Sequence, residues 1–112
     1  MVAIRPTVRR FEIYLFTLDP TMGSEIRKTR PCLIVSPDEM NEHVRTVIIA
    51  PLTRGAQAYP SRVPIRFQRK SGAVALDQLR TVDKLRLVRR LGAADGETAA
   101  SVAARLVEMF VL

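Results

Sequence analysis

The chain has 112 residues, a length typical of one compact domain, and its 47% hydrophobic and 26% charged residues indicate a globular protein rather than a disordered one. A single cysteine excludes a disulfide scaffold and any multi-cysteine metal site. No apolar run approaches the roughly 18 residues that span a bilayer, and Glu12 and Tyr14 interrupt any signal-peptide core. We therefore expect one domain over residues 1–112, cytoplasmic and without a membrane partner.

The charge balance is strongly basic, with 18 Lys and Arg against 11 Asp and Glu and a formal net charge of +7. Only Lys28, Lys70 and Lys84 are lysines, so the other fifteen bases are arginines. The planar guanidinium grips phosphate at two points, whereas lysine offers a point charge. A GC-rich coding sequence would also enrich arginine, but the excess of positive charge favours a polyanionic partner.

Short runs of β-branched and aromatic residues, bounded by Pro, Gly or Asp, predict a succession of strands. They cover residues 11–18, 32–36, 44–51, 63–67, 73–76 and 85–91. Pro51 is expected to end the third run because it cannot donate to a ladder, and 63–67 alternates as an edge strand does. We expect exposed loops over 20–29 and 54–61, and a turn at Ser71–Gly72.

The C-terminal segment has a different periodicity. Its apolar residues from Ala99 to Phe110 recur at helical spacing and form one face of a helix, with Asp95 as the expected N-cap. Several short strands followed by one helix predict a mainly β fold with one helix, a small and strongly bent barrel. Such a barrel gathers its loops on one side, where binding sites are usually built.

Polar residues follow or precede the predicted buried strands. Arg30 lies just before 32–36, Thr53 follows 44–51, and Asp77 follows 73–76 together with Gln78 and Arg80. Neighbouring strands would bring Arg30, Thr53 and Asp77 into one hollow, although strands also end in polar residues for purely structural reasons. His43 is expected on the surface, and Cys32 in the core as an inert thiol. No cluster of metal ligands is visible, so we expect neither metal nor cofactor.

Three segments together resemble the MazF/PemK family of toxin endoribonucleases. The first runs from Leu18-Asp19-Pro20-Thr21 through Gly23-Ser24-Glu25 to Arg30-Pro31, the second is Ile49-Ala50-Pro51-Leu52-Thr53, and the third spans Leu76 to Leu87. They occur in family order over roughly residues 9–92. Phe11 departs from the family pattern, which has Gly there, and Ser24 and Ala75 replace the His and Arg of a PemK-like branch.

The resemblance implies a homodimeric SH3-like barrel closed by the C-terminal helix. It implies metal-independent, sequence-specific cleavage of single-stranded RNA, which stops translation and growth, and neutralisation by a cognate acidic antitoxin. Arg30 and Thr53 match the family's essential Arg and Thr and are the expected catalytic residues. The residues expected to bind RNA are Ser24, Glu25, Asp77, Gln78, Arg80 and Arg86.

Cleavage without a metal requires the ribose 2′-hydroxyl to attack the neighbouring phosphorus, so DNA should not be cut. Arg30 would stabilise the charge that builds on the phosphate oxygens, and Asp77 or Glu25 would orient or deprotonate the 2′-hydroxyl. Tyr59 is a candidate for base stacking. The basic run Arg86, Arg89 and Arg90 would either track phosphates or form a solvated face.

Two further classes of function stay open at this point. One is a gyrase poison of the same barrel superfamily, which binds a protein and cleaves nothing. The other is a basic RNA-binding module without catalysis. Incubation with single-stranded RNA in EDTA separates the three, since only the endoribonuclease leaves discrete fragments.

Overall fold

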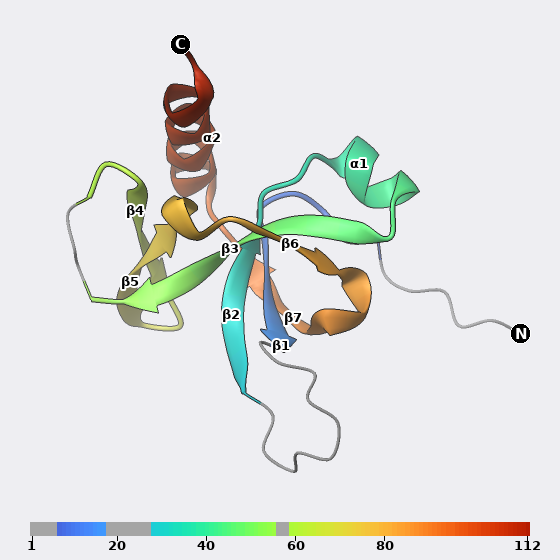
Figure 1. The fold of residues 1–112 in the computed structure, drawn as a ribbon. Coiled ribbons are helices and arrows are strands. Elements are labelled where there is room, and N and C mark those ends of the chain that lie inside the picture. The colour runs from blue at the N-terminus through green and yellow to red at the C-terminus, as the bar shows by residue number, and fades with distance from the viewer. Residues whose placement is uncertain (1–6, 18–27, 56–58) are drawn as a thin grey trace, which may run out of the picture.

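The protein folds around one antiparallel β-sheet, seen here in a computed structural model that describes residues 7–17, 28–55 and 59–112. Figure 1 shows β3 running across β2, with helix α2 above the β4–β5 end and the short helix α1 at the other end. The elements are β1 (Glu12–Thr17), β2 (Thr29–Ile34), α1 (Asp38–His43), β3 (Thr46–Arg54), β4 (Arg62–Phe67), β5 (Lys70–Ala75), the 3₁₀ turn η1 (Leu76–Gln78), β6 (Arg80–Asp83), the 3₁₀ turn η2 (Lys84–Arg86), β7 (Leu87–Ala93) and α2 (Gly96–Phe110).

The seven strands follow the order β4-β5-β3-β2-β1-β7, and β6 also pairs with β3. This confirms a mainly β fold with one C-terminal helix. The two ends of the sheet approach each other, because a Cβ added to Gly92 of β7 would lie 3.3 Å from the ring of Phe67 at the end of β4. Among the described strands, however, no ladder joins β4 to β7, so the predicted closed barrel is not confirmed.

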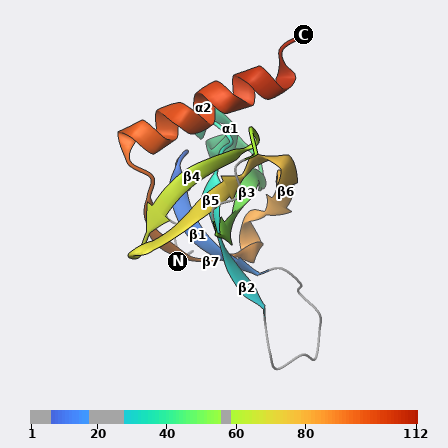
Figure 2. The ribbon, with the colours of Figure 1, turned by 90° about the vertical axis from the view of Figure 1, so that its left-hand side faces the viewer.

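Apolar side chains are buried on both faces of the sheet, in two separate clusters. The first packs against Val102 of α2 and contains Ile13, Leu33, Val35, Ala50, Leu52, Val63, Ile65, Val74 and Leu76. The second lies on the other face and contains Val8, Tyr14, Phe16, Cys32, Ile34, Val47, Ile49 and Val82. Figure 2 shows α2 lying across one side of β4 and β5.

Helix α2 confirms the prediction from the C-terminal periodicity. The Asp95 carboxylate accepts a hydrogen bond from the Thr98 N–H at 2.7 Å, as an N-cap does. The buried Val102 and the half-buried Leu106 join the first apolar cluster. Val107 and Phe110, by contrast, remain exposed toward the C-terminal end of the helix.

Two strands extend further than predicted, and both extensions matter for the site. Strand β2 begins at Thr29, so Arg30 lies inside the strand rather than before it. Strand β3 runs through Pro51 to Arg54, so Pro51 does not end it. The reason is a change of partner: β3 pairs with β6 up to Ile49 and with β5 from Leu52. Pro51 lies in the gap between these ladders, where a missing N–H costs little.

The hairpin that joins β4 to β5 turns at Gln68 and Arg69, not at Ser71–Gly72 as predicted. Both turn residues have positive φ, 51° and 64°, which is the conformation of a two-residue type I′ turn. Sequence inspection misses this turn because glycine and asparagine usually occupy such positions. Gly72 instead lies within β5, opposite Arg54 of β3.

Helix α1 and strand β6 were not predicted. Helix α1 is fixed by the buried Asn41, whose Oδ1 accepts from the Ser36 hydroxyl at 2.5 Å and whose Nδ2 donates to the Ser36 carbonyl at 3.0 Å. The Ser36 hydroxyl also accepts from the N–H of Ile48 at 3.0 Å, which ties the helix to β3. His43, at the end of α1, is exposed as expected.

Cys32 provides a test of the second apolar cluster. The thiol is fully buried, and burial raises its pKa to about 12. Because the thiolate is the reactive form, native protein should react with a thiol reagent more than about 100-fold more slowly than protein unfolded in guanidinium. The measurement is stopped-flow labelling with an aromatic disulfide at pH 8, with Cys32→Ser as the blank. Fast stoichiometric labelling of native protein would contradict this packing.

Candidate active site

The pairing of β2 with β3 places Arg30 and Thr53 on the same face of the sheet. Cys32 lies opposite Pro51, and side chains on opposed residues point to the same face. Arg30 is two residues from Cys32, and Thr53 is two residues from Pro51, so both keep that orientation. The recorded pairing of β2 with β3 ends at Cys32 and Pro51, so Arg30 and Thr53 reach this face from two diverging strands. Arg30 is exposed and Thr53 is half-buried.

Strands β5 and β4 continue this face beyond Thr53. Ala73 lies opposite Thr53, and Ala75, two residues further on, lies opposite Arg62 of β4. The two alanines are small and buried, so no long side chain of β5 separates Thr53 from Arg62. Arg62 therefore belongs to the same surface, although sequence inspection did not select it.

Arg80 reaches this surface from the short strand β6. It lies opposite Ile49, which shares its face of β3 with Thr53. Arg80 is exposed, and within the described ranges no ion pair involves it or Arg30. We call this surface the Arg30–Thr53 face; it comprises Arg30, Thr53, Arg62, Arg80 and the Asp77 that Arg62 binds.

The carboxylate of Asp77 is tightly held. Arg62 donates from Nε to Oδ1 at 2.6 Å and from Nη2 to Oδ2 at 3.0 Å, and the Ser61 hydroxyl donates to Oδ1 at 3.3 Å. The hydrogen bonds from Arg62 lower the pKa of the Asp77 carboxyl below its usual value. Asp77 is therefore a fixed, ionised acceptor and a poor proton acceptor for catalysis.

The hydroxyl of Thr53 makes one weak hydrogen bond, donating to the carbonyl of Ala73 at 3.3 Å. A donor held at this distance can turn to a stronger acceptor at little cost, and a phosphate oxygen is such an acceptor. Gly72 fixes the backbone at this point. A Cβ on Gly72 would lie 2.2 Å from the carbonyl oxygen of Thr53.

The remaining residues expected to bind RNA are placed as follows. Gln78 is exposed in η1 beside Asp77. Arg86 is half-buried at the end of η2, the turn that leads into β7. Ser24 and Glu25 lie outside the described residues. Tyr59 is exposed, as the stacking hypothesis requires, although Phe110 on α2 is a second exposed aromatic that was not anticipated.

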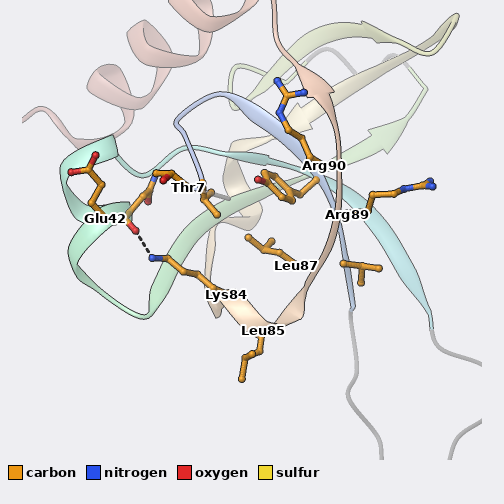
Figure 3. Close-up of a pocket in the computed structure, with 11 residues that line it drawn as sticks. Thr7, Glu42, Lys84, Leu85, Leu87, Arg89 and Arg90 are labelled. Atoms are coloured by element: carbon orange, nitrogen blue, oxygen red, sulfur yellow. Dashed lines mark hydrogen bonds between the residues drawn. The ribbon is translucent and has the colours of Figure 1, made fainter. Parts of the chain in front are cut away.

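A groove of about 600 Å³ opens elsewhere, between α1, η2 and β7, and neither Arg30 nor Thr53 lines it. Figure 3 shows the Lys84 side chain reaching α1, where its ammonium donates to the Asn41 carbonyl, while Arg89 points away. Arg90 is bound to Glu12, with Nε and Oε2 2.5 Å apart. Of the basic run, Arg89 thus keeps its guanidinium directed outward.

Within the described ranges, no group of three or more His, Cys, Asp or Glu residues gathers as a metal site would require. No helix in those ranges has the length and apolar character to cross a bilayer.

Comparison with known proteins gives concordant matches over most of the chain. The model of a family described as PemK-like, MazF-like toxin of type II toxin-antitoxin system matches residues 9–110. Endoribonuclease MazF from Staphylococcus epidermidis is 37% identical over 90 residues, which is 75% of each chain. MazF (Form-I) from Deinococcus radiodurans is 25% identical with a TM-score of 0.75 over 94% of this chain and 97% of that one. MazE-MazF (Form-II) from the same organism is also 25% identical, with a TM-score of 0.77 over 94% of this chain and 96% of that one.

The close approach at Gly72 predicts that Gly72→Ala disturbs Thr53. Because backbone must move to admit the methyl group, we expect a loss of about 1–3 kcal/mol in the free energy of unfolding. Gly96→Ala is the matched control: nothing lies within 4 Å of its added Cβ, and alanine favours the helix by up to about 1 kcal/mol. Urea denaturation measures the free energy of unfolding of both variants. Equal values for the two would refute the close approach of Gly72 to the Thr53 carbonyl.

Proposed function

Because the chain belongs to the PemK-like, MazF-like toxin family of type II toxin–antitoxin systems, we propose that it is an endoribonuclease that cuts single-stranded RNA on the Arg30–Thr53 face. The observation that carries the proposal is the β2–β3 register, which directs a guanidinium and a hydroxyl from separate strands to one surface. Cleavage at short preferred sequences within messenger RNA would stop translation and growth.

The reaction proposed is transesterification without a metal. The 2′-oxygen attacks the adjacent phosphorus, the bond from phosphorus to the 5′-oxygen breaks, and the products end in a 2′,3′-cyclic phosphate and a 5′-hydroxyl. Negative charge grows on the non-bridging oxygens as phosphorus becomes five-coordinate. Arg30 donates to these oxygens through its planar fork, and Thr53 exchanges its bond with Ala73 for one to the phosphate.

Two protons must move in this step, one from the 2′-hydroxyl and one to the leaving 5′-oxygen. Arg30 is the proposed donor to the leaving oxygen, and a guanidinium, which carries donors only and has no acceptor, is unsuitable as the acceptor. Asp77 is unsuited to accept the other proton because the hydrogen bonds from Arg62 lower the pKa of its carboxyl below the usual value. Glu25, the other carboxylate expected near the scissile bond, lies outside the described residues.

The assembly proposed for this protein is a cytoplasmic homodimer of SH3-like barrels that an acidic antitoxin neutralises. The approach of Gly92 to Phe67 supports barrel closure, since it brings the two edges of the sheet together. The formal net charge of +7 supports an acidic partner. An antitoxin segment that covers the Arg30–Thr53 face would compete directly with RNA.

Removing either catalytic group should slow cutting strongly without unfolding the protein. We expect Arg30→Ala, and Thr53→Val as an isosteric variant without a hydroxyl, each to lower kcat about 10²–10³-fold, the usual cost of one donor to a developing oxyanion. Thr53→Ser keeps the hydroxyl and should retain most activity. The measurement is cleavage of a long single-stranded RNA in EDTA, with circular dichroism to verify folding.

Arg105→Gln is the matched arginine control, because Arg105 lies on α2, on the opposite side of the sheet, paired with Glu108 at 3.4 Å. It should cut at the wild-type rate. An RNA with a 2′-deoxynucleotide at the mapped cleavage position should stay intact, since the attacking oxygen is missing. Wild-type cutting by Arg30→Ala or Thr53→Val would disprove this site, and uncut RNA with the unchanged protein would disprove the function.

The homodimer has its own test. Sedimentation equilibrium at micromolar concentration should give about twice the 12.6 kDa of one chain. A mass that stays at one chain across the range, in a preparation that cleaves RNA, would show that the monomer is the active species and would contradict the dimer.

A further inference from the structure

At the β4 side of the Arg30–Thr53 face, three side chains form a compact cluster that the catalytic step does not use. The guanidinium of Arg62 lies over the ring of Tyr59, 5.6 Å from its centroid, and binds both oxygens of Asp77. Tyr59 as a residue stays 54% exposed, whereas the Arg62 side chain is only 13% exposed. An aromatic surface is thus presented to solvent with an arginine packed behind it.

The backbone holds this cluster in place. The N–H of Arg62 donates to the carbonyl of Tyr59 at 2.9 Å, which closes the turn that carries the tyrosine. The N–H of Leu76 donates to the carbonyl of Ser61 at 3.0 Å, which ties the same turn to η1 beside Asp77. The ring and the carboxylate are therefore positioned relative to each other before any ligand arrives, which lowers the entropic cost of binding.

The hydrogen-bond inventory shows what such a cluster would accept. Among the side chains that the structure describes, two donors reach Oδ1 of Asp77, from Arg62 and Ser61, whereas one reaches Oδ2 and leaves it room for a further donor. The cluster therefore offers a flat aromatic surface and one anionic acceptor, each in contact with the Arg62 guanidinium. A nucleobase with an amino group matches both, because its ring stacks and its N–H donates.

The cluster flanks the proposed catalytic pair instead of overlapping it. Arg62 belongs to β4, and Thr53 to β3, with only β5 between them. Adjacent strands lie about 4.8 Å apart, so the two backbones are separated by ~10 Å across the face. Ala73 and Ala75 of the intervening strand leave the path between them free of long side chains.

We propose that Tyr59 and Asp77 form a subsite for a nucleotide next to the scissile phosphate, in which the base stacks on the tyrosine and its amino group donates to the carboxylate. Arg62 is the positioning residue that fixes both groups. The subsite prefers adenine, cytosine or guanine over uracil, which lacks an amino group. This inference rests on the proposed RNA cleavage and assigns one of its specificity determinants.

The first test concerns stacking. The ligand is a short oligoribonucleotide made uncleavable by a 2′-deoxynucleotide at the mapped cleavage position. Tyr59→Ala should raise its Kd about 5- to 100-fold, the effect of losing one stacked base, while Tyr59→Phe keeps the ring and should bind within about 2-fold of wild type. At saturating RNA, kcat of Tyr59→Ala should stay near the wild-type value.

Fluorescence gives a direct signature, because the chain has two tyrosines and no tryptophan, and the other tyrosine, Tyr14, is buried. Binding of the oligonucleotide should quench the tyrosine emission of wild-type protein but not that of Tyr59→Phe. Quenching that persists in Tyr59→Phe would contradict stacking on this residue.

The second test concerns Arg62. Arg62→Gln should raise KM, weaken the preference for an amino-bearing base at the flanking position, and raise the pKa of Asp77 toward its usual value in a nuclear magnetic resonance titration. Arg105→Gln, the arginine on the other side of the sheet, should change none of these.

The failure of this subsite can be told apart from failure of the function. Wild-type KM and base preference in both Tyr59→Ala and Arg62→Gln, with Arg30→Ala inactive, would remove the subsite and leave the nuclease. Loss of cutting in Arg30→Ala, together with a raised KM in the two subsite variants, supports both the nuclease function and the subsite.

Discussion

The pairing of β3 with three different strands is the constraint on which the rest of this structure depends. One strand of nine residues joins β2 on one side and β6 and then β5 on the other. The change of partner occurs around Pro51, the one position of the strand without an N–H to lose. A residue that would break an ordinary central strand is thus compatible with this one, and it marks where the sheet bends from one ladder into the next.

This bend determines which side chains share a surface. Past Pro51, β3 carries Thr53 away from the apolar cluster around Cys32 and toward the small residues of β5. Because β2 keeps its own direction, Arg30 and Thr53 emerge on one face from strands that no longer pair there. Helix α2 packs on the other face of the sheet through Val102, away from the face that carries the arginines.

Much of the fold could be predicted from local pattern, because those features depend on neighbours in sequence. The periodicity of α2, its Asp95 cap, strand β1 and the edge strand β4 are of this kind. The patterns failed where distant contacts override local preference. Pro51 is tolerated because two ladders meet there, α1 depends on the buried Ser36–Asn41 contacts, and Gln68 and Arg69 adopt positive φ to close a hairpin.

The candidate site likewise contains residues that the local sequence indicates and one that only distant pairing reveals. Arg30, Thr53 and Asp77 were selected as polar residues adjoining apolar runs and by resemblance to a family, and the register now places Arg30 and Thr53 on a common face. Arg62 carried no such signal, because an arginine at the start of an edge strand looks like any solvated base. Only the pairing of Ala75 with Arg62, and the bond to Asp77 that it permits, connects this residue to the site.

The bond between Arg62 and Asp77 also bears on how a basic face can accept a polyanion and still recognise bases. A lone carboxylate on this surface would repel phosphate, and it would oppose the field of Arg30 and Arg80. Paired with Arg62, Asp77 contributes no net charge, yet within the described residues Oδ2 receives only the Arg62 donor and can accept another. The pair thus keeps a hydrogen-bond acceptor on a cationic surface without weakening its attraction for RNA. Attraction to phosphate and selection of a base are thereby assigned to different groups on the same face.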